Sequence, residues 1–471
     1  MRKRSDKIYI TMLKKKYIGD RAFYKTVLGI AVPIMIQNAI SNFVGLLDNL
    51  MIGRVGTNAL SGVAIANQLI FIYYLLVFGA AAGIGIFTAQ YHGVRDNDGI
   101  RYTFRMKLVA NSIITAVSIA ILFIYSTPLI SLYLNGEGSA ADASETLRIG
   151  INYMDIMLIG LIPMAWTQAY AGTLRETGET RVPMFASFAA VFINLIGNYI
   201  LIYGHLGLPA MGASGAALAT VISRFIELAI LMIYTGTHAD KHPFITGAFR
   251  HFRIPGDLIG KFLFKSIPLM INEGLWSGGM AVLNQCYSYR SLSAVAAINI
   301  QNTLYNLMGV AFLTMGDAVG ILVGQILGTG DMDKAKDHAR KLTAFTVFCG
   351  LIFGLAMIAV SPFFPQLYNT SAEIRHMAMQ FIMISGILMP LNAYCHATYF
   401  IIRAGGRTGI TMIFDSCFVW FISVPAAFIM SRFTSLNVIT MLIIIQSLEI
   451  IKCIIGGVMV RMGIWARNII A

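Results

Sequence analysis

The chain has 471 residues, of which 57% are hydrophobic and only 12% are charged. Soluble domains carry about 25% charged residues, so this composition excludes a soluble globular protein and indicates an integral membrane protein. The formal net charge is +13, but the basic residues gather in alternate loops and at the termini, which argues against a nucleic-acid partner. Neither a zinc motif nor a nucleophile motif occurs, so we expect no enzyme activity, no cofactor and no metal centre.

Apolar tracts long enough to cross a bilayer follow one another along the chain. We count twelve, centred near residues 40, 78, 116, 160, 193, 223, 274, 310, 352, 388, 420 and 448. Most Lys and Arg residues lie at the termini and in every second connection, and cytoplasmic loops are the basic ones. We therefore expect a multi-pass protein of the plasma membrane with both termini cytoplasmic, and with the acidic loop 136–145 outside.

An internal repeat divides these tracts into two sets of six. At an offset of 235 residues, identical residues recur in both halves, as in the pairs Pro33 and Pro268, Asn49 and Asn284, Gly93 and Gly328, and Asp96 and Asp331. The offset becomes 228 after the 136–145 loop, where Arg175 matches Arg403. We predict an all-α membrane protein with a basic tail (1–25), an N-lobe of helices 1–6 (26–240) and a C-lobe of helices 7–12 (241–471). Such repeats are typical of transporters, with a cavity between the repeats.

The first candidate site is built around Asp48, a carboxylate inside the first apolar tract. Such a group costs about 2.5–3.5 kcal/mol in the bilayer unless a partner or a cavity relieves it. Asn194, Asn198 and Thr220 lie at a similar depth on helices 5 and 6, so the four side chains can share a level. One carboxylate and three neutral oxygens suit a proton or a small monovalent cation. Plain interhelical hydrogen bonding remains the alternative.

A second candidate set lies in the C-lobe and contains most of the remaining buried acids. Its members are Glu273, Asp317, His396 and Asp415, to which we add Asn392 on helix 10 as a substrate-binding candidate. Two further pairs, Arg224 with Glu227 and Glu449 with Lys452, have i,i+3 spacing and are interpreted as self-neutralising. Acids outnumber bases in the predicted hydrocarbon region, which favours a cation or proton pathway over an anion pathway.

In these segments the chain resembles the multidrug and toxic compound extrusion (MATE) family. The likeness covers about residues 25–460 and is carried by PIMIQNAISNFVGLLDNLMIG, AQYHGVRD, LRETGETRVPM, NLIGNYILIYGHLGLPAMGASGAALAT, GQILGTGD and IRAGGRT. The resemblance implies two six-helix lobes with a cleft and the antiport of organic cations against protons or sodium. By position, Asp48 resembles the family's coupling aspartate on helix 1, and Asn194 and Thr220 resemble its partners.

Three positions depart from the family pattern. Asn198 stands where several members carry a second aspartate, and Asn392 stands where the sodium-coupled branch has an acid. Glu273 lies on the expected helix in an uncertain register. We therefore expect a monomeric exporter of amphipathic cations coupled to protons, with sodium at Asp48 as the alternative ion. A flippase for lipid-linked saccharides and a non-transporting receptor or scaffold are the alternative functions.

Overall fold

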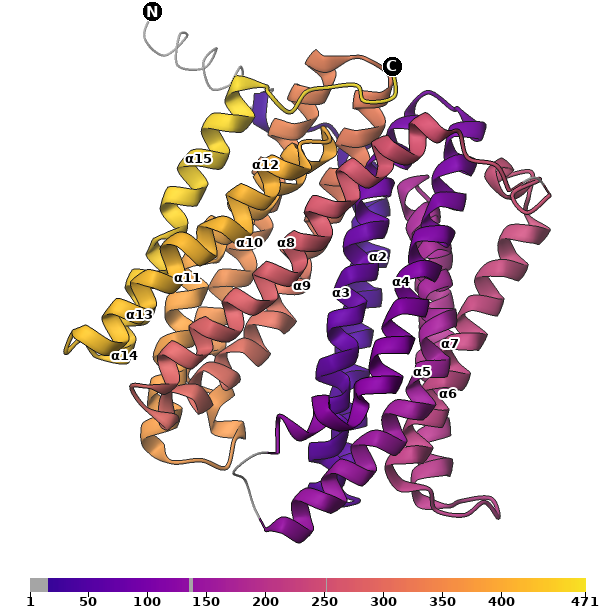
Figure 1. Ribbon diagram of the computed structural model, residues 1–471. Coiled ribbons are helices and arrows are strands. Elements are labelled where there is room, and N and C mark those ends of the chain that lie inside the picture. The colour runs from indigo at the N-terminus through magenta and orange to yellow at the C-terminus, as the bar shows by residue number, and fades with distance from the viewer. Residues whose placement is uncertain (1–15, 135–138, 251) are drawn as a thin grey trace, which may run out of the picture. The chain divides into compact units, whose positions relative to one another are not determined.

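The computed structural model describes residues 16–134, 139–250 and 252–471 (Figure 1). The first fifteen residues of the predicted basic tail, and residues 136–138 of the predicted external loop, lie outside this part of the chain. Within the described ranges the secondary structure is helical and contains no strand.

The first repeat consists of six long helices joined by short connections. They are α2 (Arg21–Gly53), α3 (Thr57–Gly93), α4 (Asn97–Ser131), α5 (Ala140–Glu176), α6 (Arg181–Tyr203) and α7 (Gly212–Thr237). A short 3₁₀ turn, η1 (Pro243–Ile245), lies in the connection to the second repeat.

The second repeat contains the same number of membrane-length segments, two of them interrupted. The first four are α8 (Gly256–Ser288), α9 (Leu292–Gly328), α10 (Met332–Val360) and, after the turn η2 (Phe364–Leu367), α11 (Ala372–Ala404). The fifth comprises α12 (Thr408–Met412), the π-helical stretches η3 (Ile413–Cys417) and η4 (Val419–Ser423), and α13 (Val424–Phe433). The sixth comprises α14 (Val438–Ser447) and α15 (Glu449–Met462).

Eleven of these segments in the described ranges are long and apolar enough to cross a membrane. The twelfth segment is α8, whose 33 residues include Lys261, Lys265 and Glu273. The predicted all-α fold with twelve membrane helices is therefore confirmed. The charged residues of α8 indicate that this helix has polar surroundings along part of its length.

Matched capping residues explain why corresponding helices of the two repeats begin and end at positions that are equivalent under the repeat. Asp96 caps α4 by accepting hydrogen bonds from the backbone of residues 98 and 99, and Asp331 caps α10 through the backbone of Lys334. Carboxylates at this position satisfy the free amides of the first helical turn. The turns after α5 and α11 contain Gly178 and Gly406 at φ of 89° and 72°, a conformation that favours glycine.

Packing divides the chain into two compact units. The N-unit comprises residues 36–88 and 96–270, and the C-unit comprises the described residues up to 35 together with 89–95 and 271–471. Helices α2, α3 and α8 each pass from one unit into the other. The unit boundaries after Met35 and Met270 lie 235 residues apart, which equals the offset of the internal repeat. The predicted lobes, 26–240 and 241–471, divide the chain in sequence order, whereas the two units divide it by packing. The lobe boundaries therefore stay a prediction.

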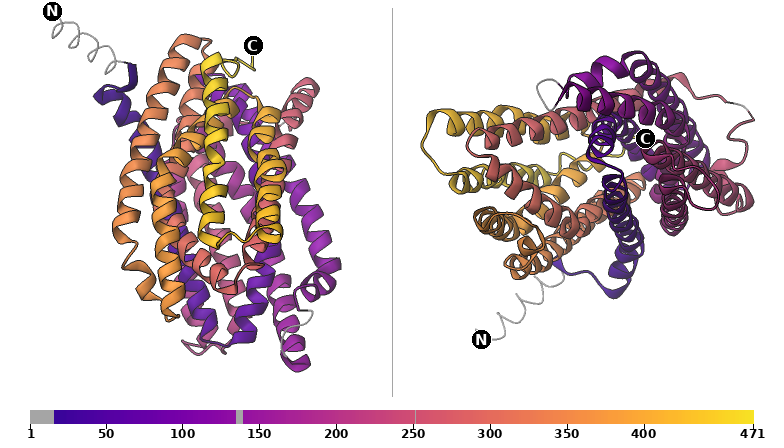
Figure 2. Two further views of the ribbon diagram at one scale, coloured as in Figure 1. Left: turned by 90° about the vertical axis from the view of Figure 1, so that its left-hand side faces the viewer. Right: turned by 90° about the horizontal axis from the view of Figure 1, so that it is seen from below.

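Each unit is a bundle whose helices run roughly along a common direction (Figures 1 and 2). In the N-unit, α4 packs on α5, and α7 packs on both α5 and α6. In the C-unit, α9, α10 and α11 pack on one another, and α15 packs on α11. The first half of α2 contributes Val27 and Ile34 to a buried C-unit cluster that includes Met315 and Val323.

Two glycines mark a reciprocal close approach of α3 and α9 inside the C-unit. A Cβ atom on Gly93 would overlap the backbone carbonyl of Gln325, and one on Gly328 would overlap the carbonyl of Gln90. The glycines correspond under the 235-residue offset, and so do the glutamines. Only glycine fits both positions, because the clash would be with rigid backbone.

Candidate functional site

The four side chains predicted to surround Asp48 lie in direct contact within the N-unit. The Nδ2 atom of Asn198 donates to Asp48 Oδ1 at 2.6 Å and to Asn194 Oδ1 at 3.3 Å. Asn194 Nδ2 in turn donates to Thr220 Oγ1 at 3.0 Å. Helices α2, α6 and α7 therefore meet through this cluster, which we name the Asp48 site. Its geometry agrees with the predicted shared level, and its role remains a prediction.

One acceptor in the Asp48 site is left without a partner. Asn198 is fully buried, and its Oδ1 atom makes no hydrogen bond in the described structure. A buried polar oxygen of this kind costs about 1–3 kcal/mol unless something else satisfies it. A proton on Asp48 or a small cation beside it would supply the missing partner. The described residues contain no group of three or more His, Cys, Asp or Glu that could hold a metal.

A second polar layer lies further along the same three helices. Ser187 and Glu227 stand seven residues from Asn194 and Thr220 respectively, which corresponds to about 10 Å along a helix and to nearly the same face. Ser187 donates to Glu227, while Gln37 donates to Ser187 at 2.6 Å. This layer therefore extends the polar path of the Asp48 site through the N-unit.

Two arginines complete this second layer. Arg224 pairs with Glu227 at 2.6 Å, as the i,i+3 spacing predicted, and Arg175 donates to Gln37 Oε1 at 2.9 Å. Arg224 also lies close enough to Asp48 to act on it electrostatically. Because it stands one turn from Thr220 on α7, Arg224 connects the two layers.

Asp415 in the C-unit is held on both carboxylate oxygens. Lys452 Nζ lies 2.7 Å from Oδ1, and Asn272 Nδ2 donates to Oδ2 at 3.3 Å. Ser416 fixes the Asn272 side chain by donating to its Oδ1 at 2.6 Å. The segment that carries Asp415 is π-helical, and π-bulges inside helices frequently occur at functional sites.

Two other predicted C-lobe residues, Asn392 and His396, form hydrogen bonds with groups other than Asp415. Asn392 donates to the Tyr305 hydroxyl at 3.2 Å, and His396 Nε2 lies 3.1 Å from the carbonyl of Leu313. Glu273 makes no hydrogen bond or ion pair in the described part of the structure. Its charged neighbours are Arg403, Asp415 and Asp317. Glu273 is therefore a predicted substrate-binding acid whose carboxylate forms no ion pair within the described residues.

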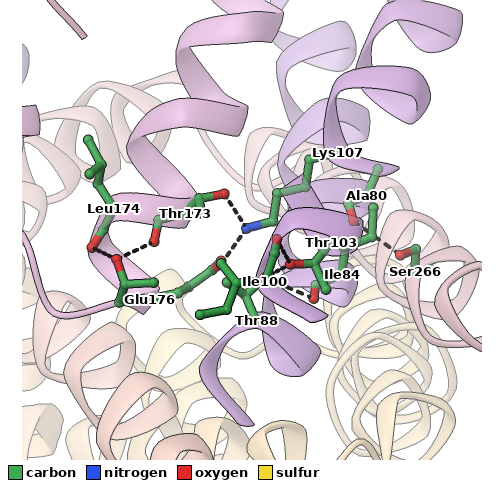
Figure 3. A network of polar contacts seen from close by, with 11 residues as sticks. Ala80, Ile84, Thr88, Ile100, Thr103, Lys107, Thr173, Leu174, Glu176 and Ser266 are labelled. Atoms are coloured by element: carbon green, nitrogen blue, oxygen red, sulfur yellow. Dashed lines mark hydrogen bonds and ion pairs between the residues drawn. The ribbon is translucent and has the colours of Figure 1, made fainter. Parts of the chain in front are cut away.

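A buried ion pair stands apart from these sites in the N-unit. Lys107 on α4 contacts Glu176 at the end of α5 and also donates to Thr173 Oγ1 at 3.3 Å (Figure 3). The lysine side chain is fully buried, and the glutamate side chain is 15% exposed. Gly85 leaves room for this carboxylate, because a Cβ atom there would overlap it. This pair joins α4 to α5 without contact to the Asp48 cluster.

Sequence reasoning missed the polar neighbours of both sites, although the repeat contains a signal for them. With the offsets 235 and 228, Gln37 corresponds to Asn272, Ser187 to Asp415 and Arg224 to Lys452. In each unit these three positions lie together in one contacting network. Comparing the two halves of the sequence would have shown that polar residues recur at these three positions.

Comparisons with known proteins agree with the fold. The family model MatE matches residues 33–200 and 268–429, two segments whose starts lie one repeat offset apart. The chain is 24% identical to "Probable multidrug resistance protein YoeA" of Bacillus subtilis, over 87% of each chain. It is 23% identical to "Probable multidrug resistance protein NorM" of Thermotoga maritima, over 88% of this chain and 87% of that one.

Solved structures show the same architecture at low sequence identity. A structure described as the outward-facing conformation of a multidrug resistance MATE family transporter superimposes with a TM-score of 0.83 at 20% identity. It covers 94% of this chain and 96% of the other. A structure of a MOP superfamily transporter from Pyrococcus furiosus, described as having a reverse polarity of its binding pocket, gives a TM-score of 0.82 at 20% identity over the same shares.

These matches, with the twelve-helix fold and its two repeats, define a membrane transporter rather than an enzyme. The family model covers well over half of the chain. The protein belongs to the MatE family.

Proposed function

We propose that the protein exports amphipathic organic cations in exchange for protons. The main observation in support is the Asp48 site, where a carboxylate within a membrane helix contacts Asn198, Asn194 and Thr220. The relatives named as multidrug resistance proteins support export as the direction of transport. The basic termini and connections support the further proposal that the chain spans the plasma membrane with both termini in the cytoplasm, because cytoplasmic loops are the basic ones.

The proton is favoured as the coupling ion by the hydrogen-bonding capacity around Asp48. The ionised carboxylate accepts the Asn198 amide at 2.6 Å. A protonated carboxyl group needs an acceptor instead, and the unpartnered Asn198 Oδ1 is available after rotation of the amide. Both protonation states are thus satisfied by the same residue. Sodium would need several oxygen ligands around net negative charge, and Asp48 is the cluster's single acid.

For the substrate, Glu273 supplies the counter-charge in the C-unit. Its carboxylate has no partner in the described structure, and a cation can neutralise it in a medium of low dielectric constant. Asp317, Asn392, His396 and Asp415 are the other proposed substrate contacts. A flippase for lipid-linked phosphates would need unpaired bases, whereas Arg224 and Lys452 both pair with carboxylates.

The test is dye transport in proteoliposomes that contain the purified full-length chain. We expect ethidium, a cationic dye, to be moved against its gradient when a pH difference is imposed at equal sodium on both sides. A protonophore should abolish this transport, and liposomes that contain Asp48→Asn should show only passive leakage.

Two results would contradict the proposal in different ways. Transport driven by a sodium gradient, without sensitivity to the protonophore, would reject the proton and retain cation export. No ethidium flux under either gradient, from protein that is folded and correctly inserted, would reject export of organic cations altogether.

A further inference from the structure

The two repeats keep a base at one position but supply its acid from different helices. Arg224 of α7 corresponds to Lys452 of α15. In the N-unit the acid is Glu227, three residues along the same helix. In the C-unit the carboxylate nearest to Lys452 is that of Asp415, which lies on another helix. Asp415 occupies the position that corresponds to Ser187 in the first repeat. A pair that served only to neutralise a base would not need this relocation.

The surroundings of Lys452 differ from those of Arg224 in a second way. The lysine ammonium lies 2.7 Å from Asp415 and 3.6 Å from Glu449, and its side chain is only 10% exposed. It also lies 5.7 Å from the ring centre of Phe414 and 6.0 Å from that of Phe418. Arg224 forms an ion pair with one carboxylate, that of Glu227, and acts on Asp48 from beyond ion-pair distance. The described residues place no aromatic ring beside it at such a distance.

Carboxylates and aromatic faces around an ammonium group are the surroundings that proteins use to bind organic cations. Here the ammonium belongs to the protein itself. Two carboxylates face one lysine, which leaves the cluster with an excess negative charge in a buried region, and such charge is costly without a second cation. The cluster therefore has the capacity for one more positive group than it contains.

We propose that Asp415, Phe414 and Phe418 form a second subsite, in addition to Glu273, for the positively charged group of the substrate, and that Lys452 is its displaceable resident occupant. When a substrate cation binds at Asp415, Lys452 moves to Glu449, one turn back on its own helix. The ammonium thus keeps a carboxylate partner in both states, so its displacement leaves no buried charge unpaired. This inference rests on the cation-export function proposed above and adds that Lys452 competes with the substrate cation for Asp415.

The first test measures binding of ethidium to the purified chain in detergent by fluorescence anisotropy. Removing the competitor with Lys452→Met should tighten binding about tenfold, if the lysine occupies Asp415 for about nine-tenths of the time. Asp415→Asn should weaken binding. As a matched control, Lys107→Met removes a buried lysine beside a carboxylate in the N-unit and should leave the affinity unchanged. Nile red, an uncharged dye, should bind all variants alike.

A second variant keeps the lysine pair intact and guards against a folding defect. Glu449→Gln removes the acid to which Lys452 moves, so the lysine stays at Asp415 and ethidium binding should weaken. If the pair is only structural, Glu449→Gln leaves binding unchanged, and Lys452→Met does not tighten it. Either result would overturn the subsite.

A third measurement does not depend on the export function. Lys452→Ala removes three methylene groups and the ammonium of the lysine side chain, a fragment that n-propylammonium matches in length and charge. We expect n-propylammonium to raise the melting temperature of Lys452→Ala and not that of the wild type or of Asp415→Asn/Lys452→Ala, with n-propanol ineffective. Loss of ethidium transport with this rescue intact would reject export but keep the subsite, and the absence of rescue would reject the subsite.

Discussion

The buried Lys107–Glu176 pair allows a stability change to be worked out from the structure. In Lys107→Met the side-chain volume is nearly kept, but Glu176, only 15% exposed, loses its base. Breaking a buried pair by removing one partner typically costs about 3–5 kcal/mol. Because the Glu176 side chain is partly exposed, solvent relieves some of this cost.

We therefore expect Lys107→Met to lower the free energy of unfolding by about 2–4 kcal/mol, allowing for partial solvation. The cost arises because the Glu176 carboxylate stays largely buried without its base. Unfolding by SDS in mixed micelles, followed by tryptophan fluorescence, measures this.

The double variant Lys107→Met/Glu176→Gln provides the control, because it removes both charges. It should recover most of the stability. A double variant as unstable as Lys107→Met would refute the reasoning, since the cost would then come from packing rather than from the unpaired carboxylate.

Three further outcomes are expected. Asp48→Asn should fold normally yet lose concentrative ethidium export, and retained concentrative export in proteoliposomes would move the coupling site elsewhere. Gly328→Ala should destabilise the C-unit by about 1–3 kcal/mol in the same SDS titration, because its Cβ atom meets the Gln90 carbonyl, whereas Gly260→Ala, with open space around it, should not. Single cysteines in place of the exposed Ser144 and Lys334 should react with an impermeant maleimide from outside and inside the cell respectively, and the opposite pattern would reverse the predicted topology.

The helices and the repeat could be predicted from the sequence because hydrophobic length and residue identity are local properties. The contact of Arg224 with Glu227 could be predicted for the same reason, since it depends only on spacing along one helix. The grouping around Asp48 followed from counting residues to helix ends, which suffices when straight helices cross the same layer.

The partner of Asp415 could not be obtained in this way. Its segment is π-helical from Ile413 to Cys417, so the usual periodicity does not say which face the carboxylate occupies. The interpretation of Lys452 as a partner of Glu449 was incomplete, because the closer contact crosses to another helix. The passage of α2, α3 and α8 between the units depends on packing between distant segments, which local patterns do not record.

The crossing of α3 and α9 has a consequence for the origin of the chain. Gly93 meets Gln325 as Gly328 meets Gln90, so each partner presents the same residues to the other. Such an isologous contact is what a twofold-symmetric pair of identical subunits requires. A half-length ancestor with one copy of this glycine and glutamine could therefore dimerise before gene fusion joined the copies. It follows that the two halves of the present chain, expressed as separate polypeptides, should still recognise each other at this crossing.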